Sequence, residues 1–299
     1  MSQLDALKLA EEMRSRAVNL ATAENYIRDA RIAKRAADIW AGPGCDGGLI
    51  SDLWIQGAFP SKQSKDSLQS LAALGMFPSD LVSYLSDNKK FPADRLLFEH
   101  QSEALRATAK LAGNDKPSLV ITAGTGAGKT EAFLFPVLSG LWRRPRSANL
   151  KGMRCLILYP MNALVTDQVT RLYEMLESQT RLTLFHFTSE TPENDRIANS
   201  RGDKWNSCRR RSREAARENI PDIVITNYSM LEYMLCRPQD NGFFGGALEY
   251  IILDEAHLYT GTLAAEITLL LRRLRSRCGV EANQITAVAP VVRTVFGDF

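Results

Sequence analysis

The sequence is short of the residues that build disulfide frameworks and zinc sites. Its 299 residues include five cysteines and three histidines, and no two cysteines stand in a Cys-x-x-Cys pair. This scatter argues against a disulfide-stapled domain and against a complete zinc site. A reducing compartment fits such cysteine usage best, so we expect a cytoplasmic protein.

Long apolar runs and a large excess of one charge are missing as well. Residues 1–20 mix charged and apolar positions, and no stretch reaches the length of a membrane span, so we expect neither a signal peptide nor contact with a membrane. The 37 basic and 34 acidic residues leave a formal net charge of +3. Any nucleic-acid-binding surface would therefore have to come from local clusters of basic residues.

Apolar residues are plentiful enough for a folded core. With 45% hydrophobic residues, the chain can bury one α/β domain of about 200 residues and an accessory segment of about 90 more, which excludes a disordered or fibrous protein. Apolar side chains recur at helical spacing from residue 2 to residue 37, and glycines with one proline interrupt the pattern between residues 41 and 48. We expect residues 1–90 to form a mostly helical accessory region.

Beyond residue 91, short apolar runs alternate with helical stretches. The runs lie at residues 118–122, 154–159, 183–187, 222–226, 250–253 and 284–289. This alternation predicts an α/β fold with a parallel sheet flanked by helices. Ligands of such sheets bind at the carboxyl ends of the strands, so the residues after each run are the first candidates for a site.

A glycine-rich segment follows the first of these runs and precedes a helical stretch, which is the context of a phosphate-binding loop. Its backbone N–H groups and the helix N-terminus would face the phosphates. Lys129 would reach the β- and γ-phosphates, and the Thr130 hydroxyl would hold Mg²⁺. The residues predicted to bind nucleotide here are Gly124, Thr125, Gly126, Ala127, Gly128, Lys129 and Thr130. The alternative is a plain glycine-rich turn.

Two carboxylates follow the apolar run 250–253. Asp254 and Glu255 stand at its carboxyl end, the edge of the sheet where the phosphate loop is also expected. Asp254 would hold Mg²⁺ through water, and Glu255 would orient and deprotonate the attacking water. Taken alone, the pair is equally typical of an acidic helix cap.

Together, these segments resemble the ATP-binding motifs of superfamily 2 DEAD/DEAH-box helicases, and Asp254-Glu255-Ala256-His257 matches their DEAH form. The resemblance implies a RecA-like domain of the P-loop NTPase class over residues 91–299, with ATP and Mg²⁺ as cofactors. The resemblance also implies that the catalytic residues are Lys129, Asp254 and Glu255. Gln101, in the segment Phe98-Glu99-His100-Gln101, corresponds to the glutamine that reads adenine.

Two further segments resemble the family's contacts with a nucleic-acid strand. They begin at Tyr159-Pro160 and at Thr226-Asn227, and small hydroxyl and amide groups of this kind suit contacts to phosphate and sugar. The residues that the resemblance implies are Pro160, Asn162, Ala163, Leu164, Gln168, Thr226 and Asn227. Each segment is weak singly, since Thr226 is also a plausible helix cap.

A narrower likeness runs to bacterial helicases of the YprA/MrfA type and to the phage-defence helicases of Druantia and DISARM systems. It rests on Leu258-Tyr259-Thr260-Gly261, on residues 270–274 and on residues 191–196. It implies DNA more than RNA as the partner, and a role in antiviral defence.

Basic residues form three clusters that either track a phosphate backbone or lie on solvated helix faces. They are Arg209, Arg210, Arg211, Arg213 and Arg217; Arg272, Arg273, Arg275 and Arg277; and Arg143, Arg144 and Arg146.

One family motif does not appear. Where Ser-Ala-Thr is expected, the chain reads Ile285-Thr286-Ala287-Val288-Ala289-Pro290, and no second RecA-like domain follows. We therefore expect the ATP-binding half of a DNA helicase or translocase that hydrolyses ATP only with a second lobe or partner subunit. The alternative is a non-catalytic subunit, or a truncated remnant, that binds nucleic acid or protein.

Overall fold

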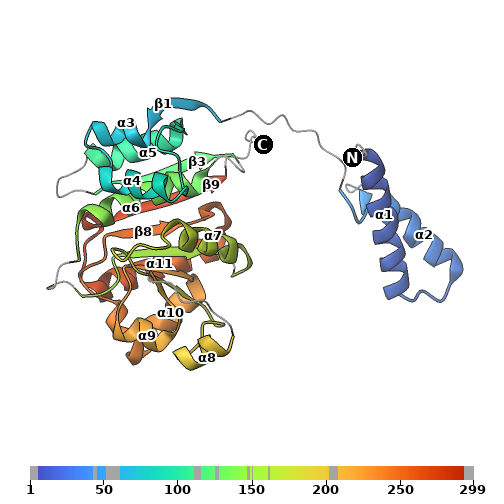
Figure 1. The fold of residues 1–299 in the computed structure, drawn as a ribbon. Helices are drawn as coiled ribbons and strands as arrows, with labels where there is room; N and C mark the ends of the chain where they lie inside the picture. Colours follow the sequence, from blue (N-terminus) through green and yellow to red (C-terminus); the bar gives the residue numbers. More distant parts are fainter. Residues whose placement is uncertain are drawn as a thin grey trace. The chain divides into compact units, whose positions relative to one another are not determined.

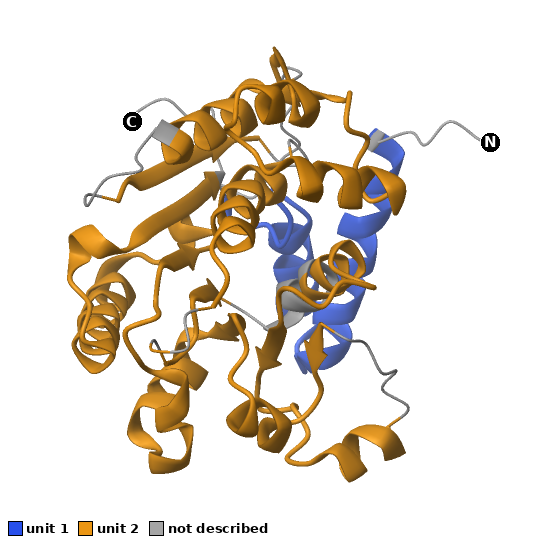
Figure 2. Ribbon diagram, turned by 60° about the vertical axis from the view of Figure 1, so that its left-hand side comes forward, with its two compact units in different colours: residues 1–59 blue, residues 60–299 orange. Residues whose placement is uncertain are grey.

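The computed structural model describes residues 6–42, 46–51, 61–110, 116–124, 128–146, 149, 151–160, 162–201 and 208–292. The chain divides into two compact units, Met1–Phe59 and Pro60–Phe299 (Figure 2).

The first unit contains a pair of helices, α1 (Ala6–Glu24) and α2 (Ala30–Ala41), which contact each other. Helix α2 begins at an N-cap formed by Asp29, whose carboxylate accepts hydrogen bonds from the backbone N–H groups of Arg31 and Ile32. Such a cap satisfies donors that the first helical turn leaves open. No residue of α2 is fully buried, so this unit has little core of its own.

The second unit is built on a seven-stranded sheet with the order β3-β9-β8-β4-β7-β5-β6, shown in part in Figure 1. All neighbouring strands are parallel. The strands are β3 (Ser118–Ala123), β4 (Cys155–Tyr159), β5 (Leu184–Phe187), β6 (Arg209–Arg210), β7 (Ile223–Asn227), β8 (Tyr250–Leu253) and β9 (Thr286–Val292). Each expected run overlaps a strand, and the predicted fold class is confirmed.

Helices cover both faces of this sheet. Successive strand residues point to opposite faces, so neighbouring residues of one strand pack against different helices. Ile157 of β4 packs in one apolar cluster with helices α5 (Glu99–Lys110), α6 (Lys129–Arg143) and α7 (Asn162–Met175). Its neighbour Leu156 packs in the other cluster, with α9 (Arg213–Glu218), α10 (Tyr228–Cys236) and α11 (Gly261–Cys278). The interior strands are therefore apolar on both faces, as parallel sheets require.

Residues 61–98 belong to this second unit and not to a separate accessory region. They form β1 (Gln63–Ser67), α3 (Leu68–Ala73), α4 (Ser79–Asp87) and β2 (Leu96–Phe98), with β1 and β2 antiparallel. The rings of Phe77 and Phe91 lie 6.2 and 5.0 Å from that of Phe135 in α6. The division thus falls after Phe59 rather than at residue 90, because these apolar side chains bury themselves against α6.

The remaining described elements are short. They are α8 (Asp195–Ser200) and the 3-10 helices η2 (Pro238–Phe243), η3 (Ala256–Leu258) and η4 (Ala282–Gln284). Within the described ranges, no helix combines the length and apolar character that crossing a membrane would need.

Charged side chains join the amino ends of three central strands. Arg154 precedes β4 and is buried; its Nε and Nη2 lie 2.9 and 2.8 Å from Oε1 of Glu249, which precedes β8. Its Nη1 lies 3.8 Å from Oδ1 of Asp222, which precedes β7. Arg144 and Lys116 approach the other Glu249 oxygen at 3.1 and 3.9 Å. This cluster lies at the sheet edge opposite the carboxyl ends of the strands.

Candidate nucleotide-binding site

The phosphate-loop segment lies at the carboxyl end of β3. Gly128 has left-handed backbone angles (φ 70°, ψ 35°) and is the N-cap of α6, so Lys129 and Thr130 begin that helix. A Cβ at position 128 would collide with the Gln101 amide nitrogen, which explains why glycine is needed here. Thr125, Gly126 and Ala127 lie outside the described residues.

The two acidic residues of the DEAH segment lie at the carboxyl end of β8. Since β9 lies between β3 and β8 in a parallel arrangement, both segments meet at one edge of the sheet. Nζ of Lys129 lies 3.7 Å from Oε1 of Glu255. The sequence separates these two residues widely, and the fold brings them together.

Backbone geometry sets the directions of the two carboxylates. Glu255 adopts a positive φ of 47°, a conformation that costs a non-glycine residue free energy and that is found repeatedly at functional sites. Its backbone N–H donates to Oδ1 of Asp254 at 2.9 Å. This turn therefore fixes the backbone at the two acidic residues.

Asp254 is a buried acid, with 7% of its surface exposed. Burial, with a smaller contribution from the charge of Glu255, raises the pKa of Asp254 to about 6, although the Glu255 N–H and Lys129 act in the opposite direction. A buried carboxylate of this kind suits a divalent cation, whose charge offsets the cost of burial. Thr130 lines the same pocket, so the oxygen donors present would fit Mg²⁺; their binding of the metal stays a prediction.

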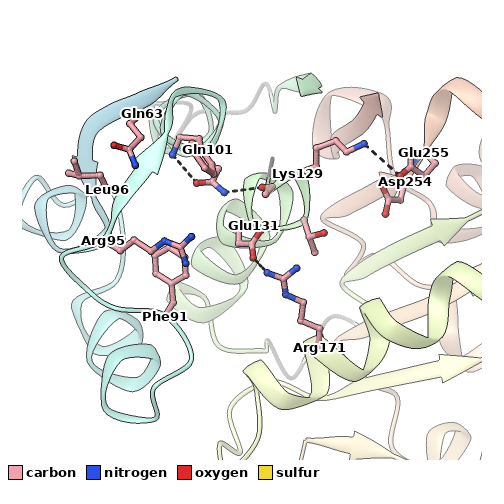
Figure 3. A pocket seen from close by; sticks show the side chains of 13 residues that line it. Gln63, Phe91, Arg95, Leu96, Gln101, Lys129, Glu131, Arg171, Asp254 and Glu255 are labelled. Atoms are coloured by element: carbon pink, nitrogen blue, oxygen red, sulfur yellow. Dashed lines mark hydrogen bonds and ion pairs between the residues drawn. The ribbon is translucent and has the colours of Figure 1, made fainter. Parts of the chain in front are cut away.

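These residues line one pocket of about 550 Å³, a size typical of cofactor sites. Figure 3 shows two groups of side chains in it: Lys129, Asp254 and Glu255 on one side, and residues of the β1–β2 region with Gln101 on the other. The lining consists of Gln63, Phe91, Arg95, Leu96, Phe98, Gln101, Gly128, Lys129, Thr130, Glu131, Arg171, Asp254 and Glu255. One end thus holds Lys129 and two carboxylates, and the other combines apolar side chains with Gln63, Gln101 and Arg95.

Gln101 ties the two sides of the pocket together. Its Oε1 accepts from the backbone N–H of Phe98 at 2.9 Å, and its Nε2 donates to the carbonyl of Gly128 at 2.9 Å. An amide has further bonding capacity on both atoms, so these bonds are compatible with base recognition. The recognition of adenine by Gln101 stays a prediction.

An ion pair in the pocket was not foreseen from the sequence. Nη2 of Arg171 in α7 donates to Oε1 of Glu131 in the first turn of α6, and Glu131 is 5% exposed. The available signal was an acid placed directly after Thr130 at the start of a mainly apolar helix. Its partner, 40 positions away, had no local signature.

The predicted nucleic-acid contacts are brought together only in part. Pro160 follows β4 and Asn227 ends β7, and the two strands are adjacent, with Tyr159 opposite Asn227. The backbone of Asn162, Ala163, Leu164 and Gln168 is in α7, whereas their side chains lie outside the described part of the structure. The two segments therefore share the strand-end edge of the sheet.

The prediction for Thr226 needs correction. Its side chain is fully buried, and its hydroxyl donates to the carbonyl of Phe187 at 2.7 Å. Its hydroxyl therefore links β7 to β5 and is not available to contact a nucleic-acid strand at the surface. Asn227 uses its side-chain oxygen to accept from the N–H of Met230 at 2.7 Å, as the N-cap of α10.

Several arginines between positions 209 and 217 are engaged within the fold. Nε of Arg217 lies 2.8 Å from Oδ1 of the buried Asp240, and its Nη1 reaches Glu193. Arg213 lies 3.3 Å from Glu193 and donates to the carbonyl of Thr188. These arginines join α9 to η2 and to the segment before α8, which favours the structural alternative over a phosphate-tracking stripe.

Residues 98–292 match the family model for DEAD/DEAH box helicases. The chain belongs to the DEAD/DEAH box helicase family. The family resemblance inferred from the motifs is thereby confirmed, and a helicase-type ATPase domain accounts for the convergence of the phosphate loop and the DEAH box.

Two curated relatives each align with about three fifths of the chain. Druantia protein DruE of Escherichia coli is 28% identical, over 64% of this chain and 15% of its own length. The ATP-dependent helicase YprA of Bacillus subtilis, described as uncharacterized, is 28% identical over 61% of this chain and 21% of its own length. The chain therefore spans only a small part of these relatives.

Solved helicase structures have the same fold. The helicase MrfA bound to DNA and AMPPNP superimposes with a TM-score of 0.55 at 22% identity, covering 79% of this chain and 28% of MrfA. Mss116p bound to ssRNA and AMP-PNP gives a TM-score of 0.58 at 18% identity, covering 80% of this chain and 42% of Mss116p. At such identities the likeness establishes the RecA-like fold alone.

Proposed function

We propose that this chain is the ATP-binding lobe of an ATP-dependent DNA helicase or translocase, and that it hydrolyses ATP together with a second lobe. The observation that carries the proposal is the meeting of Lys129 and Glu255 at 3.7 Å, in a pocket that also holds Thr130 and Asp254. Phosphoryl transfer needs this combination of a cation, a metal site and a base.

Each of these residues has a distinct task in the proposed mechanism. Lys129 binds the β- and γ-phosphates, and Thr130 with Asp254 would hold Mg²⁺, which would supply positive charge next to the phosphates. Lys129 gains a second anionic partner when phosphate enters. The Glu255 carboxylate then orients the attacking water and accepts its proton.

A second lobe is part of the proposal because hydrolysis in such motors depends on an arginine supplied from outside the ATP-binding lobe. That group is typically worth about 10³ to 10⁵ in rate. Unwinding also needs two domains that close on ATP and reopen after hydrolysis. The aligned region is 15% of DruE and 21% of YprA, which leaves ample room for such a lobe in those proteins.

DNA as the partner is the finer part of the proposal. It is supported by the motif resemblance to helicases of the YprA/MrfA type and by the MrfA structure that contains DNA, whereas Mss116p was solved with ssRNA. A role in phage defence, implied by the Druantia-type resemblance, belongs to the same proposal. Competition between single-stranded DNA and RNA of one sequence, at fixed salt, tests the choice of partner.

The proposed function is tested by ATP binding and turnover with and without single-stranded DNA. We expect Lys129→Ala to weaken ATP binding about tenfold or more, because it removes a charge-assisted contact to phosphate. Glu255→Gln should bind ATP like the parent and lose whatever hydrolysis the parent shows. If both variants bind and hydrolyse ATP like the parent, the site assignment is wrong. Binding of ATP without turnover, both with and without DNA, is the result expected of a lobe that needs a second lobe. Hydrolysis that appears when the second lobe is added would then exclude the non-catalytic alternative.

A further inference from the structure

Glu131 is an acidic side chain in a pocket proposed to receive phosphates. It follows Thr130 directly, in the first turn of α6, and lines the pocket. Only 5% of its surface is exposed. A carboxylate buried beside a polyanion is unfavourable unless specific groups stabilise it, so its hydrogen-bond partners need to be identified.

One carboxylate oxygen has a partner and the other does not. Oε1 accepts from Nη2 of Arg171, whose side chain is 51% exposed at the pocket margin. Oε2 is buried and has no hydrogen-bond partner among the described residues. It points to the phosphate loop, since a Cβ built on Gly128 would lie 3.3 Å from it. A buried acceptor of this kind calls for a donor from a ligand.

The place of Glu131 in the pocket indicates which part of the nucleotide supplies that donor. Figure 3 shows Glu131 between the group that includes Phe91, Leu96 and Gln101 and the group formed by Lys129, Asp254 and Glu255. ATP bound with its phosphates at the group around Lys129 and its base at the group around Gln101 would have its ribose between them. Phosphate oxygens only accept hydrogen bonds at neutral pH, whereas the ribose hydroxyls donate.

We propose that Oε2 of Glu131 accepts a hydrogen bond from a ribose hydroxyl of ATP, and that Glu131 thereby selects ribonucleotides over deoxyribonucleotides. This inference rests on the proposed nucleotide site. Arg171 is a positioning residue: it holds the Glu131 carboxylate and offsets its charge next to the phosphates. A site built to bond a hydroxyl rejects the analogue that lacks it, because its own buried acceptor is then left unpaired.

The test compares the Mg²⁺ complexes of ATP, 2′-deoxy-ATP and 3′-deoxy-ATP by calorimetric titration of the full chain. A hydrogen bond to a charged group predicts that one or both analogues bind about tenfold or more weakly than ATP. Glu131→Met removes the acceptor and should bring the ratio close to one. Glu131→Gln keeps an acceptor and should retain part of the discrimination. Glu174→Met, an exposed acid on α7, is the matched control and should keep the parental ratio.

The outcomes separate this inference from the proposed function. Equal affinity of the parent for all three nucleotides overturns ribose selection while leaving the nucleotide site intact, and this result needs no variant to fold. Ribose selection by Glu131 is also overturned if Glu131→Met keeps the parental ratio of affinities for ATP and its deoxy analogues. Binding of none of the nucleotides by the parent overturns the nucleotide site itself, and the inference with it.

Discussion

Asp254 is held by the fold in an environment that disfavours its charge. Burial raises the pKa of Asp254 to about 6, above the value of about 3.9 of an unperturbed aspartate. The folded state therefore binds a proton more tightly than the unfolded state, so the stability of metal-free protein falls as pH rises from about 4 to about 6 and then stays low. At neutral pH the cost is about 3 kcal/mol. Function, not stability, accounts for a carboxylate in this place.

Replacing Asp254 should accordingly stabilise the metal-free protein. We expect Asp254→Asn to raise the free energy of unfolding by about 3 kcal/mol at pH 7 and by about half as much at pH 5, while Mg²⁺-dependent ATP hydrolysis is lost. Urea unfolding in the presence of a chelator at the two pH values measures the effect. An equal gain in the free energy of unfolding at pH 5 and at pH 7 would show that the charge of Asp254 is not the cause of the gain.

At the scale of elements, the carboxyl ends and the amino ends of the strands carry different groups of charged side chains. The carboxyl ends of β3 and β8 carry the proposed nucleotide site, and Arg154 joins the amino ends of β4, β7 and β8. Removing one partner of a buried charge cluster is strongly destabilising because the remaining charges stay buried. The same cluster contains Arg144, whose side chain is 57% exposed, and exposed ion pairs contribute little.

We expect Arg154→Met to lower the free energy of unfolding by about 3 kcal/mol and Arg144→Met by less than about 1 kcal/mol. Chemical denaturation of both variants measures the difference. ATP affinity below the unfolding transition should be unchanged in both, because the cluster lies at the opposite edge from the pocket. Similar losses for the two variants would contradict the assignment of Arg154 as the centre of the cluster.

At the scale of the whole molecule, the chain has two units that differ in how many apolar side chains they bury. Residues 60–299 contain both apolar clusters of the sheet, whereas α2 of the first unit has no fully buried residue. Small segments with little apolar burial do not fold alone. The second unit should therefore carry its own stability and its own nucleotide site.

Deletion of residues 1–59 tests this division. We expect the remaining chain to unfold cooperatively, with a midpoint within a few degrees of the parent and ATP affinity within about twofold, since no pocket residue is removed. Thermal unfolding and calorimetric ATP titration are the measurements. Loss of cooperative unfolding would mean that the first unit contributes to the core, contrary to its division in the structure.

Local patterns in the sequence were sufficient for the strands, the phosphate loop and the DEAH segment. Strand runs such as 155–159 and 250–253 are apolar throughout because they are buried on both faces of a parallel sheet. Gly128 and Lys129 are recognisable because a tight backbone turn next to phosphate needs glycine and a cation at fixed spacing. Such requirements act within a few residues, so they leave a readable pattern.

Other features depend on contacts between residues far apart in the chain. The packing of Phe77 and Phe91 on Phe135 decided that residues 61–98 belong to the ATPase unit. Strand order decided that Thr226 is buried beside β5, where its hydroxyl bonds to the Phe187 carbonyl. The pairing of Glu131 with Arg171 depends on the fold bringing the start of α6 within reach of a long side chain of α7. Burial and charge pairing are properties of the assembled fold, so the sequence by itself determined the chemistry available, and the tertiary structure decided which groups meet.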